Sequence, residues 1–582
     1  MAQNDAVSPG SGTADMKLLG VLYFVLYALS ILLLYTYDVR NIFYYLVIAI
    51  MAAVVLLEIM RSEPGKKHVL ILLQIMLLTV NIIWGVTLKY YYSFGYTDIF
   101  GHVQLINSLI NLGHVTEIFE TYQPFPLWHI LASIFYQISG LPITVNTICY
   151  VLSGLIFFCL PVFMYLAAIN LLNNNKVALL SALIISFYPT LICYGIYSIP
   201  RSAESFFFVL LVYLLVGRDN PVKYYLAIFF TFVIVLYHTV SIPYILAILA
   251  VIYILNLFFA REEKKSLVTL SYLLISGAIT IIYWELFANR LIQTLITDIT
   301  SPAPTGPLTK SIFTQPTGEL FNYIQFMPTL FFLIVGALLI LRDKKVSSTV
   351  KILGIVSLLL VPITFPGPLM LVNKLAGNLN LGRFEEYTFI FIGLIAAVGL
   401  LFLFYRLKKA GKAIMLVIFI VWVLLSVSND WVALDNPLVK RSFYTFYLSE
   451  GETQGLDFIS LVRVDYLLVD YIPARYYEAV PWQPHNYTIL KVYANTSMPI
   501  VHSPNDIIIL RDKEIDRRGL RFYTANETMF WYYSSSDSYY DYYHRDDDLY
   551  NNLYSFNRIF SSPDISAYTS NELYKYYQYK QI

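Results

Sequence analysis

The chain has 582 residues, of which 58% are hydrophobic and only 13% are charged, and its formal net charge is +1. A helix that crosses a bilayer needs about 20 predominantly apolar residues, and the sequence contains many such runs. It is therefore not the sequence of an ordinary soluble protein. The sequence has no basic tract with interleaved aromatic residues, so nucleic acid is not an expected partner, and the net charge of +1 carries no information on this point. The composition predicts a polytopic membrane protein of mainly α-helical fold.

The first three quarters of the chain alternate apolar runs with short polar loops. Residues 1–15 are small and polar and lack the basic start of a cleaved signal peptide, so we predict a disordered tail and a retained first span. The hydropathy pattern predicts about 13 spans, which make residues 16–428 one membrane bundle. The runs lie near 18–36, 42–60, 69–88, 143–171, 177–195, 204–216, 224–240, 242–259, 267–287, 321–341, 349–365, 387–405 and 413–428.

One long loop, residues 89–142, interrupts this pattern. Within it, residues 101–112 and 124–139 are too short or too polar to span a bilayer easily. Amphipathic segments of this kind suit helices that lie at the membrane surface. We therefore expect two interfacial helices in the loop.

The distribution of Lys and Arg predicts the orientation. The short loops on one side carry 16 of these residues and those on the other side carry 7. Because positive loops stay in the cytoplasm, the N-terminus is predicted to be cytoplasmic, and the loop at 89–142 and everything after Ser428 are predicted to be outside. The three N-glycosylation sequons, at Asn486, Asn495 and Asn526, all lie in that last region, which agrees with this orientation.

Residues 429–582 differ in composition and predict an exterior domain of mixed α/β fold. The runs VDYLLVDY (464–471) and DIIILRD (506–512) have the character of strands and lie among helical patterns. Tyrosines are dense in YYSSSDSYYDYYH and YKYYQYK. Exposed aromatic rings can stack on sugar rings, and a low-complexity surface without ligand is the alternative.

The stretch from Tyr96 to His129 carries the first candidate site. Asp98 and His102 are four residues apart and share a face if the segment is helical. A carboxylate beside an imidazole suits proton transfer or metal binding, and an interfacial loop whose charges face water is the alternative. Further candidates in the stretch are Tyr122 and His129, whereas His114 and Glu117 are interpreted as solvated.

More polar residues fall at the predicted exterior ends of later spans. A charge near lipid costs about 2.5 to 3.5 kcal/mol on insertion scales, so such residues usually line a cavity or pair with one another. The plain alternatives are an Arg201 pair with Glu204, an Arg383 pair with one of the two acids that follow it, and a surface anchor at His238. The residues are Arg201, Glu204, His238, Arg383, Glu385 and Glu386.

These features together resemble the GT-C superfamily of membrane glycosyltransferases. The resemblance lies in an acid soon after a span (TDIFGH), two interfacial helices, the entry YQPFPLWH, many spans and an exterior C-terminal domain. It is nearest to enzymes of the protein mannosyltransferase and aminoarabinose transferase type in archaeal versions, whose tails carry a segment like YLSEGETQGLDFI. The order of spans, loop and C-terminal domain resembles that family over nearly the whole chain, but the amino-acid sequence resembles it only in short motifs. The Trp-Trp-Asp motif of oligosaccharyltransferases is missing, since FWYYSSS is no substitute, so transfer of a whole glycan to Asn is disfavoured.

The resemblance implies a reaction and roles for residues. A sugar would pass, with inversion, from a polyprenyl (dolichyl) phosphate to a glycan, lipid or protein acceptor on the exterior face. Asp98 matches the first-loop acid and would be the general base or orient the acceptor, with help from His102. Arg383 resembles the late arginine that contacts the donor phosphate, and Arg201 and His238 are further candidates. Many relatives have two adjacent acids where this chain has Thr97-Asp98-Ile99, so no cofactor is certain and a divalent metal stays open.

Other classes remain open at this stage. A lipid-linked-glycan polymerase or ligase would share the exterior site and differ in its acceptor. A secondary transporter or flippase of lipid-linked sugars would need polar residues near the midplane and broken helices. A membrane anchor for the exterior domain would not need Asp98.

Overall fold

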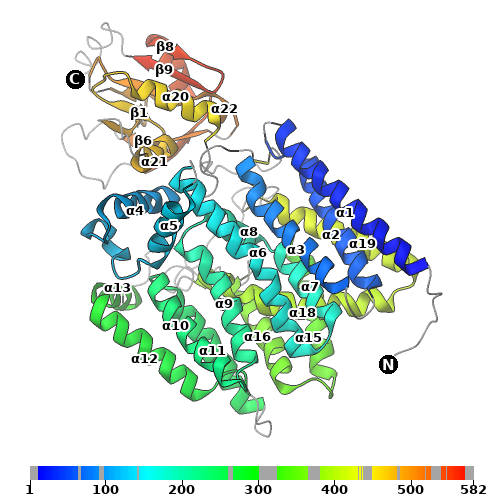
Figure 1. Ribbon diagram of the computed structural model, residues 1–582. Coiled ribbons are helices and arrows are strands. Elements are labelled where there is room, and N and C mark those ends of the chain that lie inside the picture. Colours follow the sequence, from blue (N-terminus) through cyan, green and yellow to red (C-terminus); the bar gives the residue numbers. More distant parts are fainter. Residues whose placement is uncertain are drawn as a thin grey trace. The chain divides into compact units, whose positions relative to one another are not determined.

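The structure is a computed structural model of the chain (Figure 1). It consists of two compact units, of which the first contains Met1–Gly85, His114–Phe135 and Cys149–Asn436 and the second contains Val86–Gly113, Tyr136–Ile148 and Pro437–Ile582. The residues described are 11–37, 39–62, 67–88, 90, 98–140, 143–259, 266–300, 324–364, 381–429, 432–433, 435–436, 448–480, 486–501, 503–517, 519–525, 539–545 and 547–569.

The first unit, called the membrane unit below, is a bundle of apolar helices. Among the described residues, eight helices are long and apolar enough to cross a membrane, and α7 with α8 forms a further pair bent by 56°. Every predicted apolar run contains a helix, so the mainly α-helical membrane fold is confirmed. The helices are α1 (Ser11–Thr36), α2 (Ile42–Arg61), α3 (Lys67–Trp84), α6 (Val145–Leu172), α7 (Asn175–Ser186), α8 (Pro189–Tyr197), α9 (Pro200–Val216), α10 (Pro221–Tyr237), α11 (Ser241–Phe259), α12 (Leu270–Phe287), α13 (Asn289–Thr300), α15 (Phe326–Arg342), α16 (Ser348–Thr364), α18 (Glu385–Arg406) and α19 (Lys409–Ser428).

The start of α1 differs from the prediction. The helix begins at Ser11, so the last five of the residues predicted as a disordered tail are helical. They continue the hydrogen-bonded ladder of a strongly apolar helix, which extends over polar residues at its end. The rest of the predicted tail, residues 1–10, lies outside the described residues.

Close backbone approach and buried polar pairs hold the membrane unit together. Helices α15 and α18 cross at glycines: a Cβ on Gly336 would lie 2.0 Å from the Ile395 carbonyl oxygen, and one on Gly399 would lie 2.1 Å from that of Phe332. Small residues permit such contacts between membrane helices.

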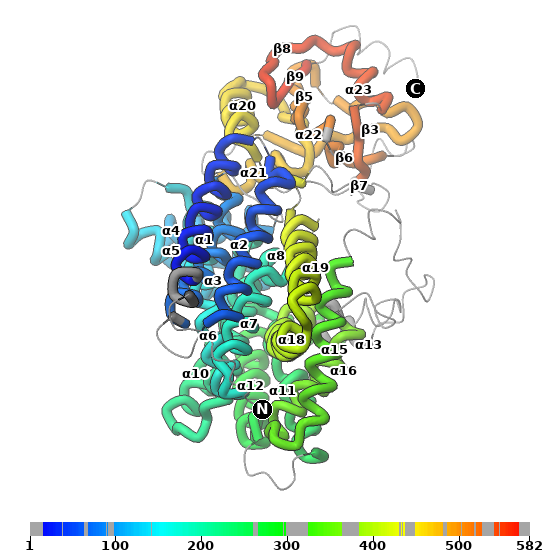
Figure 2. Tube along the Cα trace, turned by 90° about the vertical axis from the view of Figure 1, so that its right-hand side faces the viewer, coloured from blue at the N-terminus to red at the C-terminus, as the bar shows by residue number. Residues whose placement is uncertain are grey.

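Helix α2 packs against α1, α3, α7 and α19 (Figure 2). Arg40, between α1 and α2, donates to Asp435 at 2.8 Å, and both side chains are buried.

The long loop after α3 forms two of the helices that the sequence predicts there. They are α4 (Asp98–Leu112) and α5 (Leu127–Ser139), with the short helix η2 (Glu117–Tyr122) between them. Their lengths suit surface helices rather than spans. Helix α4 belongs to the second unit, where Asn107 donates to the carbonyl of Ala479 at 3.1 Å.

The C-terminal part of the second unit is a mixed α/β domain, as predicted. One sheet has the order β2-β1-β5-β9-β8 and the other has the order β4-β3-β6-β7. Both predicted strand-like runs contain strands, β1 and β5, and all five residues of β5 are buried. The strands are β1 (Leu467–Val469), β2 (Tyr487–Ile489), β3 (Lys491–Tyr493), β4 (Pro499–Ile500), β5 (Ile507–Arg511), β6 (Leu520–Ala525), β7 (Tyr539–Tyr543), β8 (Asn557–Ser561) and β9 (Ile565–Thr569), and the helices are α20 (Glu450–Ser460), α21 (Tyr471–Ala479), α22 (Asp512–Arg517) and α23 (Asp548–Asn552).

The segment YLSEGETQGLDFI begins a helix of this domain, and two of the sequons lie at its surface. The Ser449 hydroxyl accepts from the Glu452 amide at 3.2 Å and the Glu452 carboxylate accepts from the Ser449 amide at 2.8 Å, which is a capping box at the start of α20. Asn486 and Asn495 are exposed, as glycosylation acceptors must be. Asn526, most of YYSSSDSYYDYYH and all of YKYYQYK lie outside the described residues.

Candidate functional site

The predicted site residues fall into two groups. Asp98 and His102 belong to the second unit, and the other candidates belong to the membrane unit. Each group is described by itself. The membrane-unit candidates are Tyr122, His129, Arg201, Glu204, His238, Arg383, Glu385 and Glu386.

Three helices of the membrane unit begin beside one another at this site. Arg201 is the second residue of α9, Ser241 is the first of α11 and Glu385 is the first of α18. The side chains of Tyr387 and Ser241 are hydrogen-bonded, and α9 contacts both other helices. Helix N-termini carry partial positive charge and unpaired amide groups, so their convergence favours an anion.

Arg201 is held by one acid, Glu386. The Arg201 Nε donates to Glu386 Oε2 at 2.7 Å, and its Nη2 contacts the other carboxylate oxygen. The guanidinium also lies over the ring of Tyr194, 5.0 Å from the ring centre. Glu386 is almost fully buried, with 2% of its side chain exposed, whereas 22% of the Arg201 side chain remains exposed. The arginine is therefore the member of the pair that a ligand can reach.

The alternative pair of Arg201 with Glu204 is not formed. Glu204 is fully buried, and both its carboxylate oxygens lack a hydrogen-bond partner in the described part of the chain. The two residues are three apart on α9, but the Arg201 side chain meets Glu386 on α18, while the buried Glu204 lies near Tyr237 and Tyr387. Helix spacing alone could not separate these directions.

Arg383 has no acidic partner among the residues that the structure describes. It lies on the short helix η4 (Leu381–Phe384), is half-buried, and has Tyr244, Tyr194 and Tyr387 as electrostatic neighbours. Burial lowers the pKa of its guanidinium, and the positive charge of Arg201 lowers it further. Two cations near each other, with one acid bound to Arg201 and none described for Arg383, favour an anion as the ligand of this site.

The predicted partners of Arg383 are engaged elsewhere. Glu386 binds Arg201, and Glu385 accepts a hydrogen bond from the hydroxyl of Thr190. Thr190 follows Pro189, which is the first residue of α8. A proline cannot continue the preceding helix α7, so the chain bends by 56° there and α8 begins with Thr190 in its first turn. The alternative pair of Arg383 with Glu385 or Glu386 is thus not formed among the described contacts.

Two imidazoles, those of His238 and His129, extend the site beyond Tyr387 through Ser241 and Tyr122. His238 Nδ1 is 2.7 Å from the Ser241 hydroxyl, which in turn bonds Tyr387. The ring of Tyr122 lies 6.5 Å from His238 and 5.5 Å from the fully buried His129. A chain of polar side chains therefore runs from the arginines to η2.

Asp98 and His102 occupy the first turns of α4, as their spacing predicts. Asp98 is exposed and His102 is buried. Burial lowers the pKa of the imidazole to about 4, against the opposing charge of Asp98, so His102 is neutral at pH 7. A neutral buried imidazole suits holding and orienting the carboxylate more than supplying positive charge. His114 and Glu117 are both exposed, in keeping with their solvated interpretation.

Sequence reasoning missed several side chains of the membrane-unit site. Thr190, Tyr194, Tyr244 and Tyr387 are single polar or aromatic residues inside apolar helices. Only the position of Tyr387 directly after two acids could have marked it. In the described residues no three His, Cys, Asp or Glu side chains come together as metal ligands.

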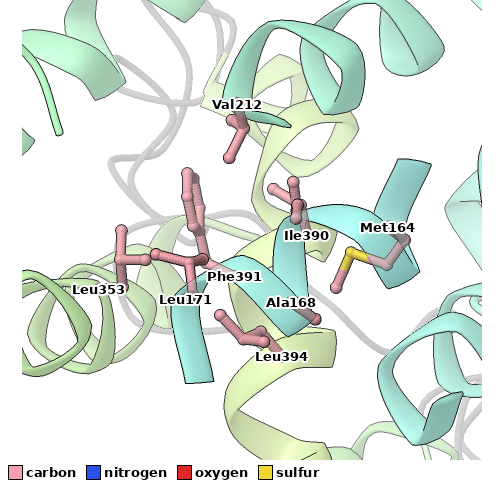
Figure 3. Close-up of a pocket in the computed structure, with 9 residues that line it drawn as sticks. Met164, Ala168, Leu171, Val212, Leu353, Ile390, Phe391 and Leu394 are labelled. Carbon is pink, nitrogen blue, oxygen red and sulfur yellow. The ribbon is translucent and has the colours of Figure 1, made fainter. Parts of the chain in front are cut away.

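A void in the bundle does not belong to the site. It lies among α6, α9, α16 and α18 and is lined by apolar side chains including Met164, Leu171 and Phe391 (Figure 3). Its volume is about 10 Å³, roughly the room that one water needs. It is a packing defect of the core rather than a substrate pocket.

Comparison with known proteins gives distant structural likeness. No protein-family model and no curated protein matches the chain. It is similar to the apo crystal structure of the Archaeoglobus fulgidus oligosaccharyltransferase, with a TM-score of 0.48, 14% identity, and coverage of 74% of this chain and 63% of that one. The archaeal oligosaccharyltransferase AglB of that organism, in complex with an inhibitory peptide and a dolichol-phosphate, gives a TM-score of 0.46 at 14% identity over 74% and 63% of the two chains. The complex with Zn and sulfate gives 0.43 at 14% over 71% and 62%. The chain spans less than two thirds of the length of these structures.

Proposed function

We propose that the protein is a membrane glycosyltransferase of GT-C type that moves a sugar from a polyprenyl (dolichyl) phosphate to a glycan, lipid or protein acceptor on the exterior face. The observation that carries this is Arg383, a half-buried arginine without an acidic partner among the described residues, beside Arg201. Its counterpart must be an anion. In a membrane protein whose sequence resembles lipid-phosphate-dependent transferases, the phosphate of a lipid-linked sugar fits that demand.

The chemistry follows from the charge of the leaving group. As the bond between the sugar and the phosphate breaks, negative charge grows on the phosphate oxygen, and arginines donate two parallel hydrogen bonds to such an oxyanion. The partial positive charge of the helix starts adds to this. The acceptor hydroxyl must lose its proton, and the resemblance implies that Asp98 takes it, giving inversion.

The orientation of the membrane unit is part of this proposal. The loop charges and the two exposed sequon residues, Asn486 and Asn495, favour an exterior C-terminal domain. Cysteines introduced at 486–501 should be labelled by a membrane-impermeant reagent on intact cells, and cysteines at 261–265 should not. The reverse pattern would place the arginines on the cytoplasmic side and overturn an exterior reaction.

Substitution of Arg383 tests the phosphate role. Arg383→Ala should weaken binding of a polyprenyl-phosphate sugar by about a hundredfold, since charge-assisted hydrogen bonds contribute about 1.5 to 3 kcal/mol each. Arg383→Lys should weaken it less, because lysine keeps the charge and loses the planar fork. Arg342→Ala, at the exposed end of α15, is the control and should bind like wild type. Equal binding by all three variants would make Arg383 a structural residue.

A flippase of lipid-linked sugars is the second candidate, because the bend between α7 and α8 is the kind of broken helix that transporters use at substrate sites. Both Thr190 and Tyr194 of the site lie on α8. Proteoliposomes separate the two functions: a flippase moves the intact lipid-linked sugar between leaflets, and a transferase releases the lipid phosphate only when an acceptor is present.

A further inference from the structure

The carboxylate of Glu386 has no evident purpose in binding a phosphate. It contacts Arg201 through both its oxygens, so it occupies hydrogen-bond donors that a phosphate would use. With 2% of its side chain exposed, it cannot move away into water without a change in α18. If the site only had to bind a phosphate, a neutral residue at position 386 would give a higher affinity, because it would leave the donors of Arg201 available.

The charge balance of the reaction gives Glu386 a role. The donor is a phosphodiester with one negative charge. When the acceptor oxygen bonds to the sugar carbon, the electron pair of the broken carbon–oxygen bond stays on the phosphate, and the acceptor proton leaves to a base. The lipid product is then a phosphomonoester, which carries a charge of about −1.5 to −2 at pH 7. The product is thus the stronger ligand for any cluster of arginines.

The described charges of the site match the donor and not the product. Arg201 and Arg383 contribute two positive charges and Glu386 removes one, which leaves one. Glu385, on Thr190, and the fully buried Glu204 have no described ion pair or hydrogen bond with either arginine. The ring of Tyr194 beneath Arg201 and that of Tyr244, which is near both arginines, are neutral.

We propose that Glu386 is a positioning residue that sets the net charge of the phosphate site to one, which removes most of the advantage that the doubly charged product would have over the singly charged donor, so that the lipid phosphate is released after transfer. This inference rests on the proposed function and names the carboxylate that regulates turnover at that site. It also explains why the acid is buried: a fixed charge discriminates between ligands only if it cannot be displaced.

Binding of two lipid phosphates by the full chain tests this. Farnesyl phosphate stands in for the product, its methyl ester stands in for the donor, and inorganic phosphate is the probe for a soluble ligand. At about pH 8 the first is a dianion and the second a monoanion. Wild type should bind the two within about threefold of each other. In Glu386→Gln the monoester should gain on the order of 10- to 100-fold over the diester, because a unit charge within a few ångströms has that effect at a protein surface.

Three further variants guard the test. Arg201→Gln should shift the preference the other way, toward the diester, and so keeps the proposal testable if Glu386→Gln does not fold. Glu386→Asp keeps the charge and should restore the wild-type ratio. Glu285→Gln changes an exposed carboxylate on α12, which accepts from Asn289, and should leave the ratio unchanged.

The outcomes separate the two proposals. An unchanged ratio in Glu386→Gln, with both ligands weakened by Arg383→Ala, overturns the role of Glu386 and leaves the phosphate site standing. Absence of binding of either lipid by wild type overturns the proposed function, and the role of Glu386 falls with it. Inorganic phosphate that competes as well as farnesyl phosphate would make the ligand a soluble anion and overturn the lipid product.

Discussion

Arg511 of the C-terminal domain and the two arginines of the candidate site, Arg201 and Arg383, have opposite surroundings. In the C-terminal domain Arg511, 2% exposed, donates to Asp470 at 2.8 and 3.1 Å and lies 3.5 Å from Glu452. Burial acts to lower the pKa of Arg511, but Asp470, Glu452 and Glu514 raise it above its ordinary value. In the membrane unit Arg201 has one acid and Arg383 has none among the described residues, and the pKa of Arg383 is lowered.

The difference separates a scaffold from a binding site. Asp470 also caps α21 by accepting from the Ile472 amide at 3.1 Å, and Glu452 closes the capping box of α20. Arg511 therefore connects the starts of two helices to the end of β5. Its Nε, Nη1 and Nη2 atoms all contact Asp470 or Glu452, which are acids of the same chain. Arg201 and Arg383 lie at helix starts too, but among the described residues their donors exceed the acids that contact them. Charge in excess of its partners is what a ligand recognises.

Asp98 provides the sharpest way to break this comparison, because it is a functional candidate in the unit that contains Arg511. It is exposed, so Asp98→Asn should leave folding and lipid-phosphate binding intact. Loss of a general base typically costs about a hundredfold to ten-thousandfold in rate, and transfer from a polyprenyl-phosphate sugar should fall by that order.

The matched control is Glu117→Gln, a neighbouring exposed carboxylate of the same long loop. It should transfer sugar at the wild-type rate. Normal turnover in Asp98→Asn would remove the general-base assignment, and loss of expression would make Asp98 a structural residue.

Arg511→Met tests the scaffold side of the comparison. Removing one member of a buried ion pair costs about 3 to 5 kcal/mol, because the remaining charges stay buried without a partner. The thermal unfolding midpoint of the full chain should fall accordingly. Lys513→Met, two residues on, breaks a pair with Asp564 at 2.7 Å whose lysine is 60% exposed, and should cost about 1 kcal/mol or less. Equal effects of the two substitutions would contradict the scaffold role of Arg511.

His102 predicts the pH dependence of stability. The pKa of its imidazole is lowered to about 4 in the folded protein and is about 6.5 when unfolded. Between these values the unfolded chain binds more protons, so stability falls as the pH drops through that window, by about 2 kcal/mol from pH 7 to pH 5. His102→Gln should reduce this loss, measured by thermal unfolding at both pH values. His114→Gln, at an exposed position, should behave as wild type, and an equal pH slope in all three proteins would contradict the assignment.

The sequence predicts the helices far better than their contacts. Apolar runs mark each membrane helix because the bilayer demands length and composition alone. The runs around Leu467 and Ile507 mark strands because β-branched residues alternate there with turn signals. The start of α1 at Ser11 was missed, since helix ends depend on the few residues least constrained by burial.

The sequence predicts which charged residues belong to the candidate site, but it does not predict which of them form ion pairs with one another. Charged residues at span ends point to a site because they are expensive near lipid, and this found Arg201, Arg383 and Glu386. That Arg201 binds Glu386 rather than Glu204 depends on which helix starts meet, 185 positions apart in the chain. Tyr387 and Thr190 were missed because their hydroxyl groups gain meaning only from neighbours on other helices.

The most direct test of the central claim is an experimental structure of the full chain with farnesyl phosphate bound. The account predicts phosphate density within hydrogen-bond distance of the Arg383 guanidinium, at the meeting of the starts of α9, α11 and α18, and with Arg201 still paired to Glu386. Phosphate bound away from both arginines, or a site in which Arg383 is satisfied by an acid of the chain itself, would contradict it.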